Sequence, residues 1–257
     1  MMRFAGNWPS VIAHRGAGQF APENTLAAMR RGLQFGCRAV EFDVMLSADG
    51  VAVLMHDPVF GRTVAGSGSV ATTSAGQLLA MDAGSWFSPA YAGEPVPLYA
   101  EVLQFCLAHG IWMDVEIKPA PGFEAATGIV VAELTEAGCQ DPTRLSFSSF
   151  SSTALQAARA TAPRWPRGLL VDAVPPDWQA QLEALECVAL DCNHVALTAE
   201  QAGAVKAAGY GLLCYTVNTL ERAQTLRSWG VDCVCTDRPD LLAGLAQAGP
   251  AEVSGAA

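Results

Sequence analysis

Positive charge is scarce in this sequence. Its 257 residues include 15 lysines and arginines against 25 aspartates and glutamates, which gives a formal net charge of −10. Because affinity for nucleic acids rests on Lys and Arg contacts to phosphates, this balance argues against a nucleic-acid-binding protein. It also implies that an anionic substrate would need a local source of positive charge, such as a metal ion, an arginine or a lysine.

Three further patterns are missing from the sequence. No apolar run approaches the roughly 20 residues that a membrane-spanning helix needs. The first residues lack the basic-then-apolar pattern of a secretory signal. Neither a Gly-x-Gly-x-x-Gly nor a Gly-x-x-x-x-Gly-Lys-[Ser/Thr] motif is present, which argues against a nucleotide-binding fold. We therefore expect a cytoplasmic protein without a membrane span.

Cysteine is plentiful, but its pattern excludes two common uses. Several of the eight cysteines fall inside apolar runs, as reduced and buried cysteines usually do. Disulfide frameworks belong to much smaller secreted domains. The pair Cys233-x-Cys235 lacks the Cys-x-x-Cys spacing of zinc sites and has no partner pair, so we predict no zinc site there.

Short apolar runs alternate with alanine-rich amphipathic stretches along the chain. Such alternation predicts a parallel sheet with helices outside it, and eight repeats favour an α/β fold closed into a TIM (β/α)₈ barrel. The predicted strands are Val11–His14, Ala39–Val44, Ile111–Ile117, Arg144–Ser148, Gly168–Val171, Cys187–Asp191, Tyr210–Val217 and Val231–Thr236. The predicted helices are Thr25–Phe35, Phe123–Ala137, Ser152–Thr161, Trp178–Leu185, Ala199–Ala208 and Leu220–Trp229.

One part of the chain departs from this alternation. Ala39–Leu46 and Val51–His56 are joined by Ser-Ala-Asp-Gly, a hairpin-type turn, so a short extra strand follows the second barrel strand. Residues 58–100 then form a long insertion of the kind that serves as a lid or a binding loop. We predict one barrel domain over residues 1–248 and a disordered tail over residues 249–257.

Three acidic side chains stand near predicted strand ends. Glu41 and Asp43 share one face of their strand, because side chains repeat every two residues, and Glu116 lies near the end of the next barrel strand. Buried carboxylates are costly unless they are neutralised, and hard divalent cations such as Mg²⁺ or Ca²⁺ prefer oxygen ligands. The alternative is a set of ion pairs with basic residues: Arg15, Arg38 and Lys118.

Two histidines, His14 and His56, each end a strand-like run. A pair of histidines suits in-line displacement at phosphorus, because one can remove a proton from the attacking oxygen while the other protonates the leaving oxygen. Either histidine alone is more often a structural residue, but the pair beside three carboxylates favours a catalytic role. Arg15 follows His14, and Lys118 shares the face of Glu116, so both are candidates for phosphate contacts.

Several motifs, taken in order from about residue 11 to residue 240, resemble the glycerophosphodiester phosphodiesterase family. They are His14-Arg15-Gly16, Pro22-Glu23-Asn24-Thr25, Glu41-Phe42-Asp43, His56-Asp57, Glu116-Ile117-Lys118-Pro119, Ser149-Phe150, Tyr215-Thr216-Val217-Asn218 and Thr236-Asp237. The segments Trp165–Leu170 and Trp229–Asp237 look like the bacterial cytosolic branch linked to glycerol-phosphate uptake.

The resemblance implies a TIM barrel with a small insertion after the His56 strand. It implies metal-dependent hydrolysis of glycerophosphodiesters to sn-glycerol 3-phosphate and a free alcohol. The implied roles are as follows: His14 and His56 as the catalytic pair, Glu41, Asp43 and Glu116 as ligands of Mg²⁺ or Ca²⁺, and Arg15 and Lys118 as phosphate contacts. Tyr215, where many relatives carry Trp, and Trp86 in the insertion are further candidates for substrate binding.

Three other functions stay open at this point. A lyase on the same barrel would stop at a cyclic phosphate. A lysophospholipase D would favour apolar residues in the insertion, where Trp86, Phe87 and Tyr91 stand. A non-catalytic glycerophosphate-binding protein is disfavoured, because both histidines and all three acids are present. The sequence decides neither the preferred alcohol, nor Mg²⁺ against Ca²⁺, nor which histidine is the acid, nor the oligomeric state.

Overall fold

The computed structural model describes residue 4 and residues 8–247 of the chain. In this part of the chain eight parallel strands close into a barrel, since β1 pairs with both β2 and β9. The predicted TIM-barrel fold is confirmed. The barrel strands are β1 (Val11–Ala13), β2 (Ala39–Leu46), β4 (Trp112–Ile117), β5 (Leu145–Ser149), β6 (Arg167–Val171), β7 (Ala189–Asn193), β8 (Gly211–Tyr215) and β9 (Cys233–Thr236).

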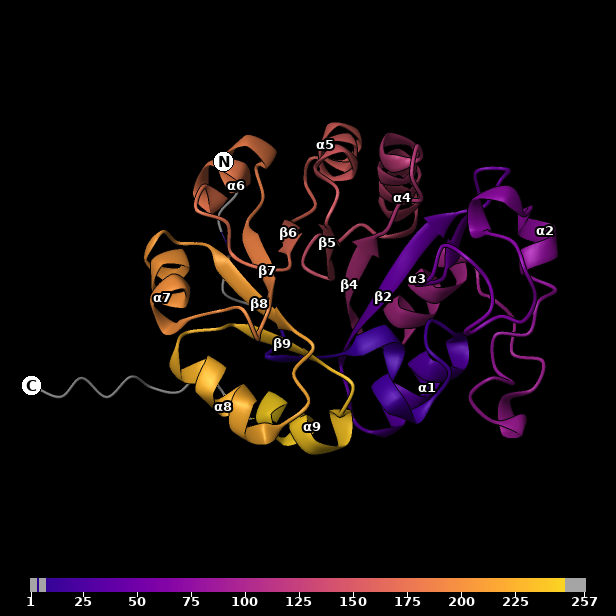
Figure 1. The fold of residues 1–257 in the computed structure, drawn as a ribbon, viewed down its shortest axis with the longest axis horizontal. Coiled ribbons are helices and arrows are strands. Elements are labelled where there is room, and N and C mark those ends of the chain that lie inside the picture. Colours follow the sequence, from indigo (N-terminus) through magenta and orange to yellow (C-terminus); the bar gives the residue numbers. More distant parts are fainter. Residues whose placement is uncertain (1–3, 5–7, 248–257) are drawn as a thin grey trace, which may run out of the picture.

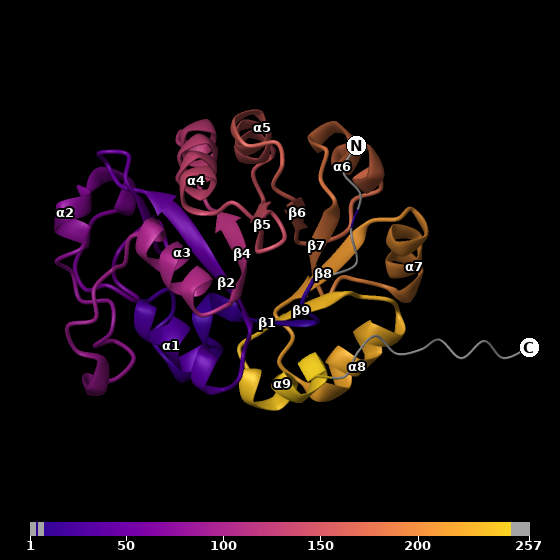
Figure 2. The same cartoon turned by 180° about the vertical axis from the view of Figure 1, so that it is seen from behind.

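Helices cover the outside of the barrel (Figures 1 and 2). They are α1 (Leu26–Gln34), α3 (Tyr99–Ala108), α4 (Glu124–Gly138), α5 (Ser152–Thr161), α6 (Trp178–Leu185), α7 (Ala199–Ala207), α8 (Leu220–Ser228) and α9 (Pro239–Gln247). The described helices do not have the length and apolarity that crossing a membrane requires.

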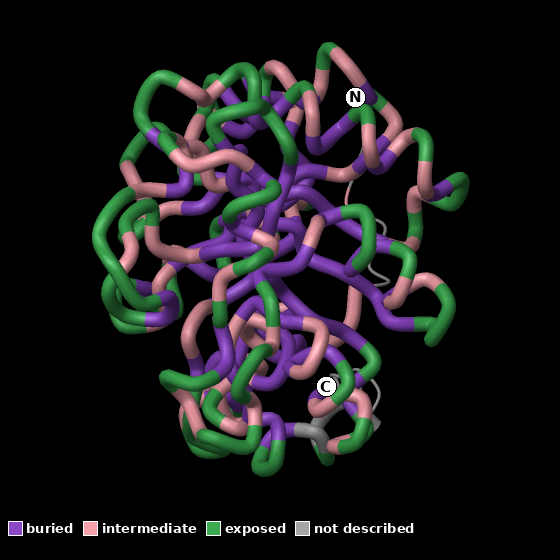
Figure 3. Tube along the Cα trace, turned by 90° about the vertical axis from the view of Figure 1, so that its right-hand side faces the viewer, coloured by how far each residue is buried: buried purple, intermediate pink, exposed green. Residues whose placement is uncertain are grey.

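The barrel strands form the buried centre of the molecule. In Figure 3 the strands are buried and the exposed segments lie mainly in the surrounding loops and helix faces. All eight residues of β2 are buried, including Glu41 and Asp43. Side chains of a strand point alternately to its two faces, and all of those on β2 are buried because the barrel interior covers one face and the helices cover the other. The polar side chains of the site are therefore fixed on a rigid and largely apolar frame.

A short extra strand and an insertion extend the second barrel unit. Strand β3 (Ala52–Leu54) pairs antiparallel with the carboxyl-terminal end of β2. The following residues include two 3₁₀ turns, η3 (Val70–Thr72) and η4 (Pro89–Tyr91), and the short helix α2 (Ala75–Leu78). An apolar cluster holds this region on the barrel: Met45, Val53, Met55, Val64, Val70, Leu78, Ala83 and Val96. The predicted tail, residues 249–257, lies outside the described residues.

Candidate active site

Three carboxylates gather where β2 and β4 lie side by side. Oxygen atoms of Glu41, Asp43 and Glu116 lie within 4.8 Å of one another. The two strands are in register, with Asp43 opposite Glu116, so adjacent parallel strands bring the acids together. All three are largely or fully buried. A group of buried oxygen donors this close suits a hard divalent cation.

The charges of these acids are only partly offset by protein groups. Burial raises the pKa of Glu41 well above its ordinary value, and the Asp43 and Glu116 carboxylates raise it further. Burial and the Asp43 carboxylate likewise raise the pKa of Glu116 to about 8. One carboxylate oxygen of Glu41, Oε1, is buried and has no hydrogen-bond partner among the described residues. An unsatisfied buried acceptor is costly, and a bound cation would satisfy it.

Asp43 is the best neutralised of the three acids. Its carboxylate accepts hydrogen bonds from Lys118 Nζ at 2.9 Å and from Asn24 Nδ2 at 2.7 Å. Arg15 Nε lies 3.5 Å from it. Burial favours the protonated form of Asp43, but Lys118 and Arg15 outweigh it and hold the pKa of this carboxyl below its ordinary range. Lys118 also lies 3.2 Å from Glu116, so the predicted phosphate contacts adjoin the acids.

His14 is held by a carboxylate from the last barrel strand's loop. Its Nδ1 lies 2.6 Å from Asp237 Oδ1. The other oxygen of Asp237 accepts a hydrogen bond from Asn218 Nδ2 at 3.1 Å, and the Asp237 amide donates to Asn218 Oδ1 at 2.8 Å. Burial opposes ionisation of Asp237, but the hydrogen bonds from His14 and Asn218, together with the charges of His14 and Arg15, outweigh burial and lower the pKa of Asp237. An ionised carboxylate only accepts, so His14 carries its proton on Nδ1 and directs Nε2 toward Glu41.

His56 is held by a chain of ion pairs that includes the insertion. Its Nδ1 lies 2.7 Å from Asp57 Oδ1, and Asp57 Oδ2 accepts from Arg62 Nε at 2.5 Å. Arg62 also donates twice to Glu23, each time at 2.7 Å. Glu23 in turn accepts from Arg15 Nη1 at 2.8 Å. Arg62 therefore joins the His56 segment to the segment that carries Arg15.

The loop after β1 needs unusual backbone geometry to build this site. Gly16 has φ 100°, and a Cβ there would lie 2.8 Å from the Cβ of Ala28 in α1. Gly18 has φ 56°, and a Cβ there would lie 2.3 Å from the backbone of Asp237. Glycine is the residue that tolerates both positive φ and such close approach. The two glycines thus allow His14, Arg15 and Asp237 to meet at one end of the barrel.

Two cavities adjoin the site. The outer one has a volume of about 510 Å³, and its lining includes His14, Arg15, Glu23, Trp86 and Phe87. The inner one measures about 50 Å³ and is lined by His14, Glu41, Glu116, Tyr215 and Cys235 among others. Trp86 is 41% exposed and packs edge-on against Phe87. The Tyr215 hydroxyl donates to the carbonyl of Val171 at 2.9 Å, which fixes its ring at the inner cavity.

The sequence and the fold are similar to those of known proteins. The model of the "Glycerophosphoryl diester phosphodiesterase family" matches residues 14–241. The chain belongs to this family. The family and the enzyme class expected from the motifs are thereby confirmed, while the narrower branch linked to glycerol-phosphate uptake stays a prediction.

Full-length relatives support the assignment to the glycerophosphoryl diester phosphodiesterase family. The chain is 31% identical to the glycerophosphodiester phosphodiesterase of Caldanaerobacter subterraneus, over 93% of this chain and 98% of the relative. A Bacillus subtilis enzyme of the same name is 28% identical over 90% of this chain and 84% of the relative. A solved phosphodiesterase from Oleispira antarctica, in complex with the product sn-glycerol-3-phosphate, is 39% identical with a TM-score of 0.87, covering 90% and 94% of the two chains.

The predicted site residues of this family member lie together at one end of the barrel. The structure also shows side chains that bond to them and for which the sequence predicted no role. These are Asp237 and Asn218 behind His14, Asp57 and Arg62 behind His56, and Asn24 beside Asp43. Asn24 has φ 57° and its side chain bonds both the carboxylate and the amide of Asp43. Thr25, the next residue, caps helix α1, so the Asn24 side chain serves the acid.

Proposed function

We propose that this protein hydrolyses glycerophosphodiesters to sn-glycerol 3-phosphate and an alcohol. In this proposal His14 and His56 exchange protons with the reacting oxygens, and Glu41, Asp43 and Glu116 hold a divalent cation. The observation that carries the proposal is the meeting of two carboxylate-bound histidines with three buried acids at one end of the barrel. That end, in TIM barrels, is where active sites lie.

The residues present fit a hard divalent cation, Mg²⁺ or Ca²⁺. The free Oε1 of Glu41 and the raised pKa of both glutamates indicate negative charge that Arg15 and Lys118 do not fully offset. When bound, such a cation supplies Lewis-acid stabilisation of phosphate oxygens. Metal dependence is thus supported by the donor set.

The two histidines are proposed to act through Nε2. Asp237 and Asp57 each occupy the Nδ1 side of one ring, which fixes its orientation and leaves Nε2 as the nitrogen that takes or gives the proton. General acid–base groups typically contribute about 10²- to 10⁴-fold each. Burial lowers the pKa of His56, ahead of the opposing effect of Asp43.

Arg15 and Lys118 are proposed to hold the phosphate. Arg15 Nε is buried without a hydrogen-bond partner among the described residues, and Arg15 also lines the outer cavity. A guanidinium can contact two phosphate oxygens at once, whereas the ammonium of Lys118 acts as a point charge. The side chains of Arg15 and Lys118 already face the acids, so a bound phosphate would lie where the positive charge of these two side chains is concentrated.

The outer cavity is proposed to receive the alcohol. Trp86 and Phe87 line it together with the carboxylates of Glu23 and Asp237. An exposed indole face beside carboxylates suits a quaternary ammonium group, which is attracted to aromatic faces. Choline is therefore the alcohol that this lining favours. Tyr215, at the inner cavity, is proposed to contact the part of the substrate closest to the metal-binding acids.

The proposal is tested by replacing each histidine in turn. His14→Ala and His56→Ala should each lower kcat on glycerophosphocholine by about 10²- to 10⁴-fold while melting stays cooperative. His109→Ala is the matched control, because His109 ends α3 and bonds the Phe105 carbonyl away from the acids. Near-normal turnover in either of the first two variants would remove that histidine from the reaction.

Phosphorus NMR of the same reactions separates the rival functions. Hydrolysis gives sn-glycerol 3-phosphate, whereas a lyase would leave a cyclic phosphate as the final product. A lysophospholipase D would release choline faster from lysophosphatidylcholine than from glycerophosphocholine. The expected result is glycerol 3-phosphate with the deacylated substrate preferred.

A further inference from the structure

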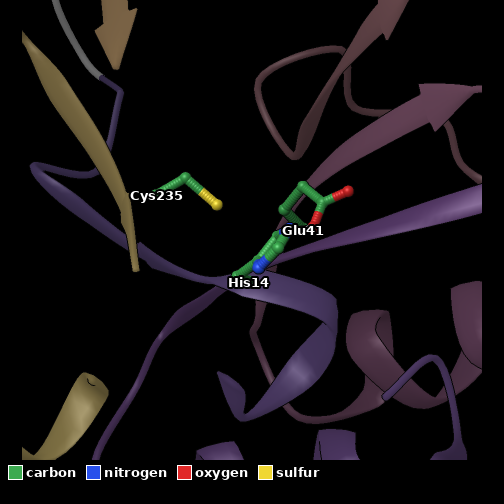
Figure 4. Close-up of side chains that lie close together, drawn as sticks. All are labelled: His14, Glu41 and Cys235. Carbon is green, nitrogen blue, oxygen red and sulfur yellow. Dashed lines mark ion pairs between the residues drawn. The ribbon is translucent and has the colours of Figure 1, made fainter. Parts of the chain in front are cut away.

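A second group of metal-ligating side chains lies beside the three acids. Ligand atoms of His14, Glu41 and Cys235 lie within 4.8 Å of one another. Figure 4 shows the three side chains converging, with the thiol of Cys235 directed toward the carboxylate and the imidazole. Cys235 lies on β9, Glu41 lies on β2, and His14 directly follows β1. These strands are neighbours, because β1 pairs with both β9 and β2.

The donor atoms of this group are available. His14 Nδ1 is engaged by Asp237, which leaves Nε2 as the free ring nitrogen, 3.9 Å from Glu41 Oε2. Glu41 is only 6% exposed, and its Oε1 has no hydrogen-bond partner among the residues that the structure describes. A carboxylate behind a histidine, as Asp237 is here, is the usual support of a metal-bound imidazole.

There is also room for an ion between these side chains. All three line the inner cavity of about 50 Å³. A cavity needs only about 10–15 Å³ to admit one water molecule, so an ion and a solvent ligand fit. Leu170 and Leu213 form apolar parts of the wall, so the cavity offers few competing polar groups on that side.

We propose that His14, Glu41 and Cys235 form a binding site for a soft or borderline divalent cation, Zn²⁺ or Cd²⁺. Zn²⁺ takes imidazole, carboxylate and thiolate ligands in a tetrahedron, at about 2.0–2.3 Å, which places neighbouring donors about 3.3–3.8 Å apart. Side-chain shifts of about 1 Å or less reach that spacing from the separations in the structure. Cys235 loses its thiol proton to solvent on binding, and solvent fills the fourth position.

This site differs from the neighbouring one in its chemistry. Glu41, Asp43 and Glu116 offer oxygen atoms alone, as Mg²⁺ and Ca²⁺ prefer. The thiolate of Cys235 selects softer ions. The Cys233-x-Cys235 spacing predicted no zinc site, and Cys233 takes no part in this one. The ligands are distant in sequence, at residues 14, 41 and 235, and only barrel closure unites them.

Occupation of the site should inhibit the enzyme. A cation on His14 Nε2 removes the nitrogen that exchanges the proton, and it shares Glu41 with the three-acid group. This consequence rests on the proposed function, in which His14 is catalytic. The binding itself does not, so binding and inhibition are measured separately.

The binding test is a Cd²⁺ titration of the full chain in the presence of excess Mg²⁺, followed by the ultraviolet absorption of cadmium–thiolate bonds. Wild type should develop this band at one equivalent of Cd²⁺. Cys235→Ala should lose it at every Cd²⁺ concentration at which wild type saturates, because Cys235 supplies the one thiol of the proposed site. Cys233→Ala is the matched control, because Cys233 is a buried thiol on the same strand.

Two further variants keep the binding test decisive if Cys235→Ala folds poorly. Cys235→Val fills the space of the thiol without offering a ligand. His14→Gln removes a different ligand from a different part of the chain, and it should weaken Cd²⁺ binding as well. A wild-type protein without a cadmium–thiolate band, or a band that survives in the Cys235 and His14 variants, would overturn the site.

The inhibition test compares Zn²⁺ sensitivity of turnover. Cys235→Ala should need at least about 10-fold more Zn²⁺ than wild type for half inhibition, each protein being measured against its own turnover in Zn²⁺-free buffer. Equal sensitivity of the two proteins would overturn the inhibitory role. If Cd²⁺ binds through Cys235 but turnover is not lost, the metal site exists and the proposed role of His14 in the reaction is wrong. If the chain shows no turnover at all, the cadmium titration still decides whether the site exists.

Discussion

Replacing Asp237 by asparagine tests the orientation of His14 with almost no change in shape. Asp237 accepts from Asn218 through one oxygen and from His14 Nδ1 through the other. In the Asp237→Asn variant the side-chain oxygen would keep the Asn218 contact, which turns the new NH₂ group toward His14. The ring would then have to accept at Nδ1 and carry its proton on Nε2. His14 could no longer take a proton at Nε2. Its imidazolium form would also lose the carboxylate of Asp237, which accepts from Nδ1.

The magnitude follows from the role assigned to His14. The expected loss in kcat approaches that of removing the imidazole, about 10²- to 10⁴-fold, or about 2.7 to 5.4 kcal/mol of transition-state stabilisation. The two changes should not add, because both disable one group. His14→Ala with Asp237→Asn should therefore be no slower than His14→Ala alone.

The assay is release of sn-glycerol 3-phosphate from glycerophosphocholine by the single and double variants at saturating substrate and cation. Melting of Asp237→Asn measures any general loss of packing. Turnover within about twofold of wild type, or full additivity in the double variant, would refute the orienting role of Asp237.

Further predictions address the metal site, stability, the insertion and specificity. Glu116→Gln should weaken Mg²⁺ or Ca²⁺ binding measured by calorimetry; unchanged affinity would remove Glu116 from the ligands. In metal-free protein the pKa of Glu116 is raised from 4.5 to about 8, so the folded state binds its proton more tightly than the unfolded state does. Its stabilising contribution is complete below pH 4.5 and is lost as the pH rises toward 8; the melting temperature should fall over that range, and saturating cation should reduce the fall. Arg62→Gln should lower kcat on glycerophosphocholine by about 10-fold, less than loss of a catalytic group. Arg238→Gln, whose guanidinium pairs with Asp240, is the control; equal effects of the two changes would show that Arg62 has no special role. Trp86→Ala should lower kcat/KM more for glycerophosphocholine than for glycerophosphoglycerol, by about 3- to 5-fold as expected for an exposed cation–π contact; an earlier melt with an unchanged substrate ratio would assign Trp86 to packing.

The barrel could be predicted because its strands are short, apolar and regularly spaced. Each predicted strand has a counterpart, although Cys187–Asp191 was placed two residues too early against β7 (Ala189–Asn193). Helices α3 and α9 were not predicted. In Tyr99–Ala108 the exposed face carries only two polar side chains, Glu101 and Gln104, so the amphipathic pattern is weak. Because α3 directly follows the irregular insertion, the sequence pattern does not mark where this helix begins.

The site could be predicted only as far as local motifs extend. His14 and Glu116 stand at or next to strand ends, and Glu41 and Asp43 share one face within β2, so strand periodicity assigns their positions. His56 follows the short strand β3. Their partners could not be found this way. Asp237 meets His14 across 223 residues of chain, and Arg62 reaches Glu23 across 39. Such contacts depend on barrel closure and on the path of the insertion, which the spacing of residues does not encode.

The most direct test of the proposed reaction is turnover of glycerophosphocholine by the full chain, followed by phosphorus NMR, with and without a divalent cation. The account predicts sn-glycerol 3-phosphate and choline as products, loss of the reaction after chelation, and its return with Mg²⁺ or Ca²⁺. Undiminished turnover after verified removal of metal would contradict the role of the three acids. Absence of turnover with every cation and glycerophosphodiester tried would contradict the function itself.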